Sequence, residues 1–399
     1  MTATRRPRTA TASRSGATTR RTSGREGRLL QSADEKPRGS STYAWMFAIV
    51  AILNLLGLLM VLSASSVTSL YEYGSSWYQF ERQLMWLILG TGALIVSLRL
   101  DYQRWRRFVG PLLLVSGVLM LMVLLPGLGR SANGSSRWIG YGPIGVQPSE
   151  LVKLAMIVFV ADLLARRADR AHDWRLTLKP VMAVFTAFAA LLMLQPNLGT
   201  TIILATIVLA MLFVAGVPGK PLAVTIGVLV SGATAFAFLE PYRFRRLMAF
   251  RDPWADPLNT GFQTIQSQVG LANGGLFGTG LGEGRAKWGF LPEAHTDFIF
   301  AIIGEELGLL GAMTVVALFV ALGLLGVRTA LRAPDRFGML IAAGVTTWIL
   351  VQAFINIGAV VGVLPITGVP LPFVSSGGSS LLFTMAAVGL LLNVARQAR

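Results

Sequence analysis

The stretch LPEAHTDFIFAIIGEELG carries many ionisable groups for so apolar a part of the chain. These groups are Glu293, His295, Asp297, Glu305 and Glu306. Asp297 stands directly before an apolar run, whereas the two glutamates lie inside that run. A carboxylate at membrane depth is costly unless it is paired, hydrated or functional. At the mouth of the run, Asp297 is placed where a carboxylate can act as a general base.

Glu305 and Glu306 lie eight and nine residues beyond Asp297, which is roughly 12–14 Å along a helix. They cannot share a substrate atom with Asp297 at that distance, so we expect supporting roles, with one of them capped or paired inside the helix bundle. The neighbouring His295, Glu293, Lys287 and Arg285 could shift the pKa of Asp297 in either direction. The basic residues among them could neutralise a phosphate-bearing ligand.

A second group lies in SRWIGYGPIGVQPSELVKLA, residues 136–155. Glu150 and Lys153 are three positions apart, so they share one face of the helix expected there. Two interpretations stay open: an ion pair that satisfies both charges, or a pair that faces a ligand. Trp138 fits an aromatic anchor at the membrane interface.

The composition indicates a membrane protein that crosses the bilayer several times. Of its 399 residues, 53% are hydrophobic and 14% are charged, against about 25% charged in ordinary globular domains. The net charge of +16 would suit nucleic acid, but ten of the 35 Lys and Arg residues lie in residues 1–43 and most others flank apolar runs. Membrane topology explains this distribution better, and we expect no nucleic-acid partner. With no cysteine and two histidines, disulfides, thiolate metal sites and His-rich zinc sites are excluded.

Ten apolar stretches have roughly the 20 residues that one span needs, which predicts an all-α fold with ten transmembrane helices. The stretches are residues 44–66, 80–98, 108–125, 149–165, 180–194, 199–216, 221–239, 298–327, 338–363 and 375–395. We expect residues 1–43 to form a disordered basic tail, and residues 44–399 to form the ten-span domain.

The distribution of basic residues predicts the orientation of these spans. The segments that would face the cytoplasm hold 25 of the 35 Lys and Arg residues, so the positive-inside rule places both termini there. Residues 240–297, between the seventh and eighth spans, then form a long extracytoplasmic loop. Its aromatic and apolar content predicts that the loop is ordered.

The glycine-rich stretch GGLFGTGLGEG, residues 274–284, is similar in composition to a phosphate-binding loop. That motif needs a preceding strand and a following helix, and neither is expected here, so we predict turns instead. The sequence also has no convincing inverted repeat, which disfavours a secondary transporter.

Several motifs together resemble the SEDS family (shape, elongation, division and sporulation) of ten-span peptidoglycan glycosyltransferases. The resemblance covers residues 44–395 and is carried by NGSSRWIGYGPIGVQPSELVKLA, QPNLGT, RRLMAFRDPWADP, GFQTIQSQVGLANGGLFGTGLGEG, LPEAHTDFIFAIIGEELGLLG and GVLPITGVPLPFVSSGGSSLLF. The DPW and LPEAHTDFIFA motifs favour the division branch over the elongation branch. Two positions depart from the pattern: Asn197 replaces the usual aspartate of QPDLGT, and Ser376 replaces a frequent tyrosine.

The resemblance implies that lipid II, linked to undecaprenyl pyrophosphate, is polymerised into β-1,4 glycan with inversion at the anomeric carbon. The essential aspartate of the family falls on Asp297, which would be the general base. Cations would stabilise the departing pyrophosphate. The candidates are Lys153, Arg243, Arg246 and Lys287, and a divalent cation such as Mg²⁺ or Mn²⁺ is a further candidate. The supporting or substrate-binding candidates are Trp138, Glu150, Glu293, His295 and Ser375.

The resemblance also implies partners and a location. A class B penicillin-binding protein would crosslink the glycan, other division proteins would bind, and the enzyme would work at the division site of the bacterial cytoplasmic membrane. A lipid II flippase is the first alternative, but it needs no base at the outer interface. A noncatalytic scaffold and an elongation-type polymerase are the others.

Overall fold

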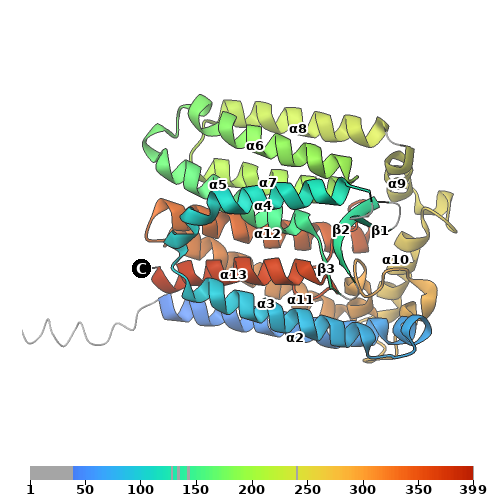
Figure 1. The fold of residues 1–399 in the computed structure, drawn as a ribbon. Coiled ribbons are helices and arrows are strands. Elements are labelled where there is room, and N and C mark those ends of the chain that lie inside the picture. The colour runs from blue at the N-terminus through green and yellow to red at the C-terminus, as the bar shows by residue number, and fades with distance from the viewer. Residues whose placement is uncertain (1–38, 127–128, 133–134, 142–143, 240, 399) are drawn as a thin grey trace, which may run out of the picture.

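The computed structural model describes residues 39–126, 129–132, 135–141, 144–239 and 241–398, most of them helical (Figure 1). The predicted tail of residues 1–43 therefore falls, up to residue 38, outside the described residues. The long helices are α2 (Gly39–Tyr73), α3 (Tyr78–Arg99), α4 (Val109–Leu124), α5 (Pro148–Arg166), α6 (Trp174–Leu194), α7 (Leu198–Val214), α8 (Gly219–Leu239), α11 (Ile299–Leu331), α12 (Arg336–Val361) and α13 (Ser379–Gln397). Shorter ones are η1 (Tyr102–Phe108), η2 (Ala168–Arg170), α9 (Pro241–Arg251), η3 (Pro253–Ala255), α10 (Phe262–Gly274) and η4 (Ala286–Phe290).

Seven helices in the described part of the chain are long and apolar enough to cross a membrane. They are α2, α4 together with η1, α6, α8, α11, α12 and α13. The helix α7 is apolar but shorter, and α5 carries the charges of Glu150, Lys153, Asp162 and Arg166. The chain is thus a multi-pass membrane protein.

A three-stranded antiparallel sheet corrects the all-α expectation, because the fold is mostly helical but not wholly so. The strands β1 (Gly129–Ala132), β2 (Ser135–Tyr141) and β3 (Ile144–Val146) pair in the order β1-β2-β3. Their sequence is short and rich in glycine and serine, so it lacks the long apolar alternation that predicts a strand. The sheet connects α4 to α5 and lies at one end of the bundle, near α9 and α10 (Figure 1).

The predicted outer loop, residues 240–297, folds into α9, η3, α10 and η4. The turn after α10 packs against a break in α11 at Gly308, whose φ of 71° favours glycine. There the main-chain N–H of Leu309 donates to the oxygen of Gly275 at 2.9 Å, and that of Thr279 donates to the oxygen of Glu305 at 2.9 Å. The glycine-rich stretch is therefore held against α11 by main-chain hydrogen bonds.

Candidate active site

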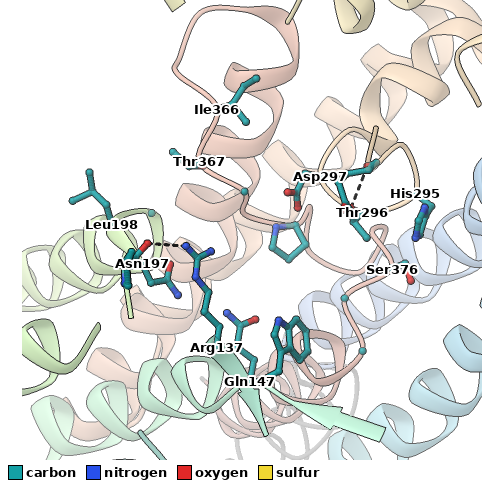
Figure 2. A pocket seen from close by; sticks show the side chains of 18 of the residues that line it. Arg137, Gln147, Asn197, Leu198, His295, Thr296, Asp297, Ile366, Thr367 and Ser376 are labelled. Atoms are coloured by element: carbon teal, nitrogen blue, oxygen red, sulfur yellow. Dashed lines mark hydrogen bonds between the residues drawn. The ribbon is translucent and has the colours of Figure 1, made fainter. Parts of the chain in front are cut away.

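A cavity of about 910 Å³ opens at the end of the bundle that carries the sheet and α9. It is lined by the ends of α2, α3, α7 and α8, by β2 and α9, by the residues before α11 and by the connection between α12 and α13 (Figure 2). Its polar and aromatic lining includes Tyr73, Gln79, Arg82, Gln83, Trp86, Arg137, Trp138, Gln147, Asn197, Arg246, Glu293, His295, Thr296, Asp297, Thr367 and Ser376. Five of the candidate residues from the sequence are thus brought together: Trp138, Arg246, Glu293, His295 and Asp297.

Asp297 is half-buried in the cavity wall, two residues before α11 begins. Burial and, to a smaller extent, the negative charge of Glu293 raise the pKa of its carboxyl, Arg246 and Arg137 lower it, and the net result is a pKa of about 7. The Asn356 side chain donates to the main-chain oxygen of Asp297 at 2.7 Å. The backbone of Asp297 is therefore held in place, and its carboxyl has a pKa near neutral.

His295 and Glu293 sit beside Asp297 and differ in their surroundings. His295 is half-buried, and its burial lowers the pKa of the imidazole. Its main-chain oxygen accepts a hydrogen bond from the N–H of Ser376 at 3.0 Å. Glu293 is exposed at a φ of 58°, and its carboxylate accepts from the Thr296 hydroxyl at 2.8 Å.

Two arginines face Asp297 from different elements. Arg246, on α9, donates to the main-chain oxygen of Ile366 at 3.4 Å. Arg137, on β2, donates to the main-chain oxygens of Gln195 at 3.3 Å and Pro196 at 2.7 Å. The cavity therefore places the Asp297 carboxylate opposite two cations that are held by main-chain oxygens.

Sequence reasoning missed Arg82 and Arg137 as cavity residues. Arg137 directly precedes Trp138, so the motif that singled out the tryptophan also contained the arginine. Arg82 lies near the start of α3, and nothing in its local sequence signals that it lines the same cavity as Arg137 and Arg246.

Glu150 and Lys153 form an ion pair of 2.9 Å, with side chains 3% and 1% exposed. Lys153 also donates to the Gln352 side chain at 2.7 Å, and the Ser380 hydroxyl donates to Glu150 at 2.9 Å. The ammonium lies 4.6 Å from the centre of the Trp348 ring. Of the two interpretations, the structure has the intrahelical ion pair, and neither residue lines the cavity.

Of the remaining candidates, Lys287 and Ser375 do not line the cavity. Lys287 is buried and pairs with Glu306 at 3.0 Å, while the Ser63 hydroxyl donates to Glu306 at 2.7 Å. Ser375 is buried, and its hydroxyl accepts from the N–H of Leu371 at 2.8 Å. Arg243 belongs to α9, but its side chain lies outside the described residues.

The expectation that one of Glu305 and Glu306 is capped or paired inside the protein is confirmed, since both have partners. The Glu305 carboxylate accepts the main-chain N–H groups of Arg285 at 2.9 Å and Ala286 at 3.1 Å. With the pair between Lys287 and Glu306, these bonds attach the glycine-rich turn to α11. Both glutamates are about 1% exposed, so their contribution is structural.

Few side chains of the described residues could hold a metal ion in the cavity. Among the described residues, no three His, Cys, Asp or Glu side chains gather as a metal site. The acidic residues that line the cavity are Asp297 and Glu293. Mg²⁺ is usually bound by one or two carboxylates together with substrate phosphates, so Asp297 could supply one ligand only when a phosphate is present.

Comparison with known proteins shows the family to which this chain belongs. Residues 43–399 match the family described as cell cycle protein, which includes FtsW, RodA and SpoVE. The chain belongs to the SEDS family. It is 43% identical to a probable peptidoglycan glycosyltransferase FtsW of Geobacter metallireducens, over 88% of this chain and 94% of the relative. It is 42% identical to stage V sporulation protein E of Bacillus subtilis, over 88% and 96%.

Solved SEDS structures share the fold. A chain from a peptidoglycan synthase complex, described as coordinating polymerization and crosslinking, superposes with a TM-score of 0.72 at 29% identity, over 88% of this chain and 97% of that chain. The rod shape determining protein RodA of Thermus thermophilus gives a TM-score of 0.64 at 27% identity, over 88% and 96%.

Proposed function

We propose that this SEDS chain is a peptidoglycan glycosyltransferase that polymerises lipid II into β-1,4 glycan during septal wall synthesis. The observation that carries the proposal is Asp297, which faces Arg137 and Arg246 across a cavity at one end of the bundle. Relatives that are 40–43% identical bear the name peptidoglycan glycosyltransferase FtsW.

The proposed reaction uses Asp297 as the general base. Its carboxylate takes the proton from the 4-hydroxyl of the acceptor GlcNAc, and that oxygen attacks C1 of the donor MurNAc. The bond between C1 and the pyrophosphate oxygen breaks as the new bond forms on the opposite face, so the α-linked donor gives a β-linked product. A base is most effective when its pKa lies near the working pH, and the pKa of Asp297 is about 7.

The leaving group is undecaprenyl pyrophosphate, which departs with extra negative charge. Arg82, Arg137 and Arg246 line the cavity and would stabilise this charge, because cations fixed in advance need no reorganisation during the reaction. Trp138 would contact a sugar, and Glu293 would help keep the pKa of Asp297 high. Lys153, Glu150, Lys287 and Ser375 would support the structure rather than touch the substrate.

We also propose that α3, α5 and α7 cross the membrane, which makes ten spans with both termini in the cytoplasm. The described ends of the chain, at α2 and α13, lie at the same end of the bundle (Figure 1). The cavity and residues 240–297 lie at the other end, which would be the outer face of the cytoplasmic membrane. Lipid II would reach the cavity from that side at the division site.

A class B penicillin-binding protein is the proposed partner, since polymer must be crosslinked to become wall; other division proteins would join them. The similarity to a chain of a peptidoglycan synthase complex supports this pairing.

The test is incubation of the purified chain with labelled lipid II, with and without its cognate penicillin-binding protein. We expect glycan strands, with a higher yield when the partner is added. Movement of lipid II across proteoliposomes without any glycan would instead support a flippase. Depletion in cells should give filaments, whereas spheres would indicate an elongation-type enzyme.

A further inference from the structure

One wall of the cavity is the N-terminal end of α7, where Asn197 is the capping residue. Its side-chain oxygen accepts the N–H of Thr200 at 3.3 Å. Since the oxygen is used in the cap, the amide nitrogen must point elsewhere. That nitrogen is buried, and it has no hydrogen-bond partner in the part of the chain that the structure describes. Asn197 is only 5% exposed, yet it lines the cavity.

The same wall carries further donors. Leu198 and Gly199, the first two residues of α7, also line the cavity. The first N–H groups of a helix have no partners within it, and the helix dipole favours an anion there. Arg137 is anchored on the main-chain oxygens of Gln195 and Pro196, the two residues directly before Asn197. Figure 2 shows Arg137 and Asn197 side by side, with Asp297 across from them.

We propose that this wall, formed by Arg137, the Asn197 amide and the first N–H groups of α7, binds the pyrophosphate of the polyprenyl-linked donor. The inference rests on the proposed function and names the site of its leaving group. A buried donor without a partner is costly, and a phosphate oxygen would satisfy it. Helix N-termini are common phosphate sites, and arginine gives the strongest hydrogen bonds to phosphate.

Asn197 makes this wall particular to the chain, because the SEDS pattern usually has aspartate at that position. An amide contributes a donor where a carboxylate would contribute a negative charge. Asn197→Asp is therefore a sharp test, since aspartate also caps helices well and should preserve α7. Asn273→Asp is the matched control, because it makes the same change at an exposed residue of α10 outside the cavity.

The experiment measures binding of undecaprenyl pyrophosphate to the intact protein in detergent with EDTA, so that no metal bridges a carboxylate to the phosphate. We expect Asn197→Asp and Arg137→Gln each to raise Kd by about ten-fold or more, the size of a lost charge-assisted bond. Asn273→Asp should bind like the wild type, and undecaprenol, which has no phosphate, should bind all four proteins equally. Unchanged Kd for both cavity variants, with unchanged thermal unfolding, would overturn the proposal.

The binding measurement needs no turnover, so it separates this inference from the proposed function. If the wild type makes no glycan but the cavity variants lose affinity, the phosphate site stands and the polymerase assignment fails. If the wild type makes glycan and Asn197→Asp shows an unchanged KM and unchanged affinity, the polymerase stands and the phosphate site fails.

Discussion

Asn356 of α12 donates its side-chain amide to the main-chain oxygen of Asp297 at 2.7 Å and to that of Val369 at 2.8 Å. One buried side chain thus joins the segment before α11 to the connection between α12 and α13, and both segments line the cavity. Asn356 touches the backbone of Asp297 rather than any substrate, so we regard it as a positioning residue.

Replacing Asn356 by alanine should therefore lower kcat by roughly 10²-fold, because a shift of about 1 Å at the reacting group can cost that much. KM should change little. The matched control is Asn393→Ala, which removes a buried amide that donates to Leu98 at 2.8 Å and Leu100 at 2.6 Å on a part of α13 remote from the cavity. Both variants should lose stability in thermal unfolding. Equal kcat values for the two would show that Asn356 acts through stability alone.

The pH dependence of polymerisation follows from Asp297. A protonated carboxyl cannot accept the hydroxyl proton, so kcat/KM should rise with pH and reach half its maximum near the pKa of about 7. Arg246 lowers that pKa, so the profile of Arg246→Gln, scaled to its own maximum, should move to higher pH. A wild-type profile that is flat from pH 5 to 8 would contradict the assignment of Asp297 as base.

The ion pair between Lys287 and Glu306 predicts a stability effect separate from catalysis. Removing one partner of a buried pair typically costs about 3–5 kcal/mol, so Lys287→Met and Glu306→Gln should each lower the melting temperature in detergent. The double variant Lys287→Met/Glu306→Met should melt at a higher temperature than either single variant, because no unpaired charge is left. If the single variants melt like the wild type but polymerise poorly, Lys287 has a direct role in the reaction.

The proposed orientation can be tested with cysteines, since the chain has none of its own. Leu258, which is 82% exposed between η3 and α10, should react as cysteine with an impermeant maleimide in intact cells. Arg170, exposed in η2, should react as cysteine only after the membrane is permeabilised. The reverse labelling pattern would show that the proposed topology is inverted.

Much of the helical fold follows from sequence, because long apolar runs have few alternatives in a membrane. Asp297, Trp138 and Arg246, which the motifs single out as candidates, all line the cavity. The sheet was missed because its strands are short and carry no periodic signal.

The sequence predicts less well which cations line the cavity, because burial depends on contacts between distant parts of the chain. Lys153 is enclosed by Gln352, Trp348 and Glu150, two of which lie about 200 positions away. Lys287 likewise meets Ser63 and Glu306. Arg82 and Arg137 line one cavity with Arg246 although the three lie on α3, β2 and α9, which are far apart in the sequence.

The most direct test of the whole account is glycan synthesis from labelled lipid II by Asp297→Asn, at matched protein amounts and with the penicillin-binding partner present. Asparagine keeps the shape of the side chain and removes the base. Asp169→Asn, the same change at an exposed residue of η2, is the control and should polymerise normally. We expect the Asp297 variant to bind the partner and to lose activity by about 10²–10⁴-fold, the usual cost of losing a general base. Near-normal glycan from the folded Asp297→Asn protein would contradict the account.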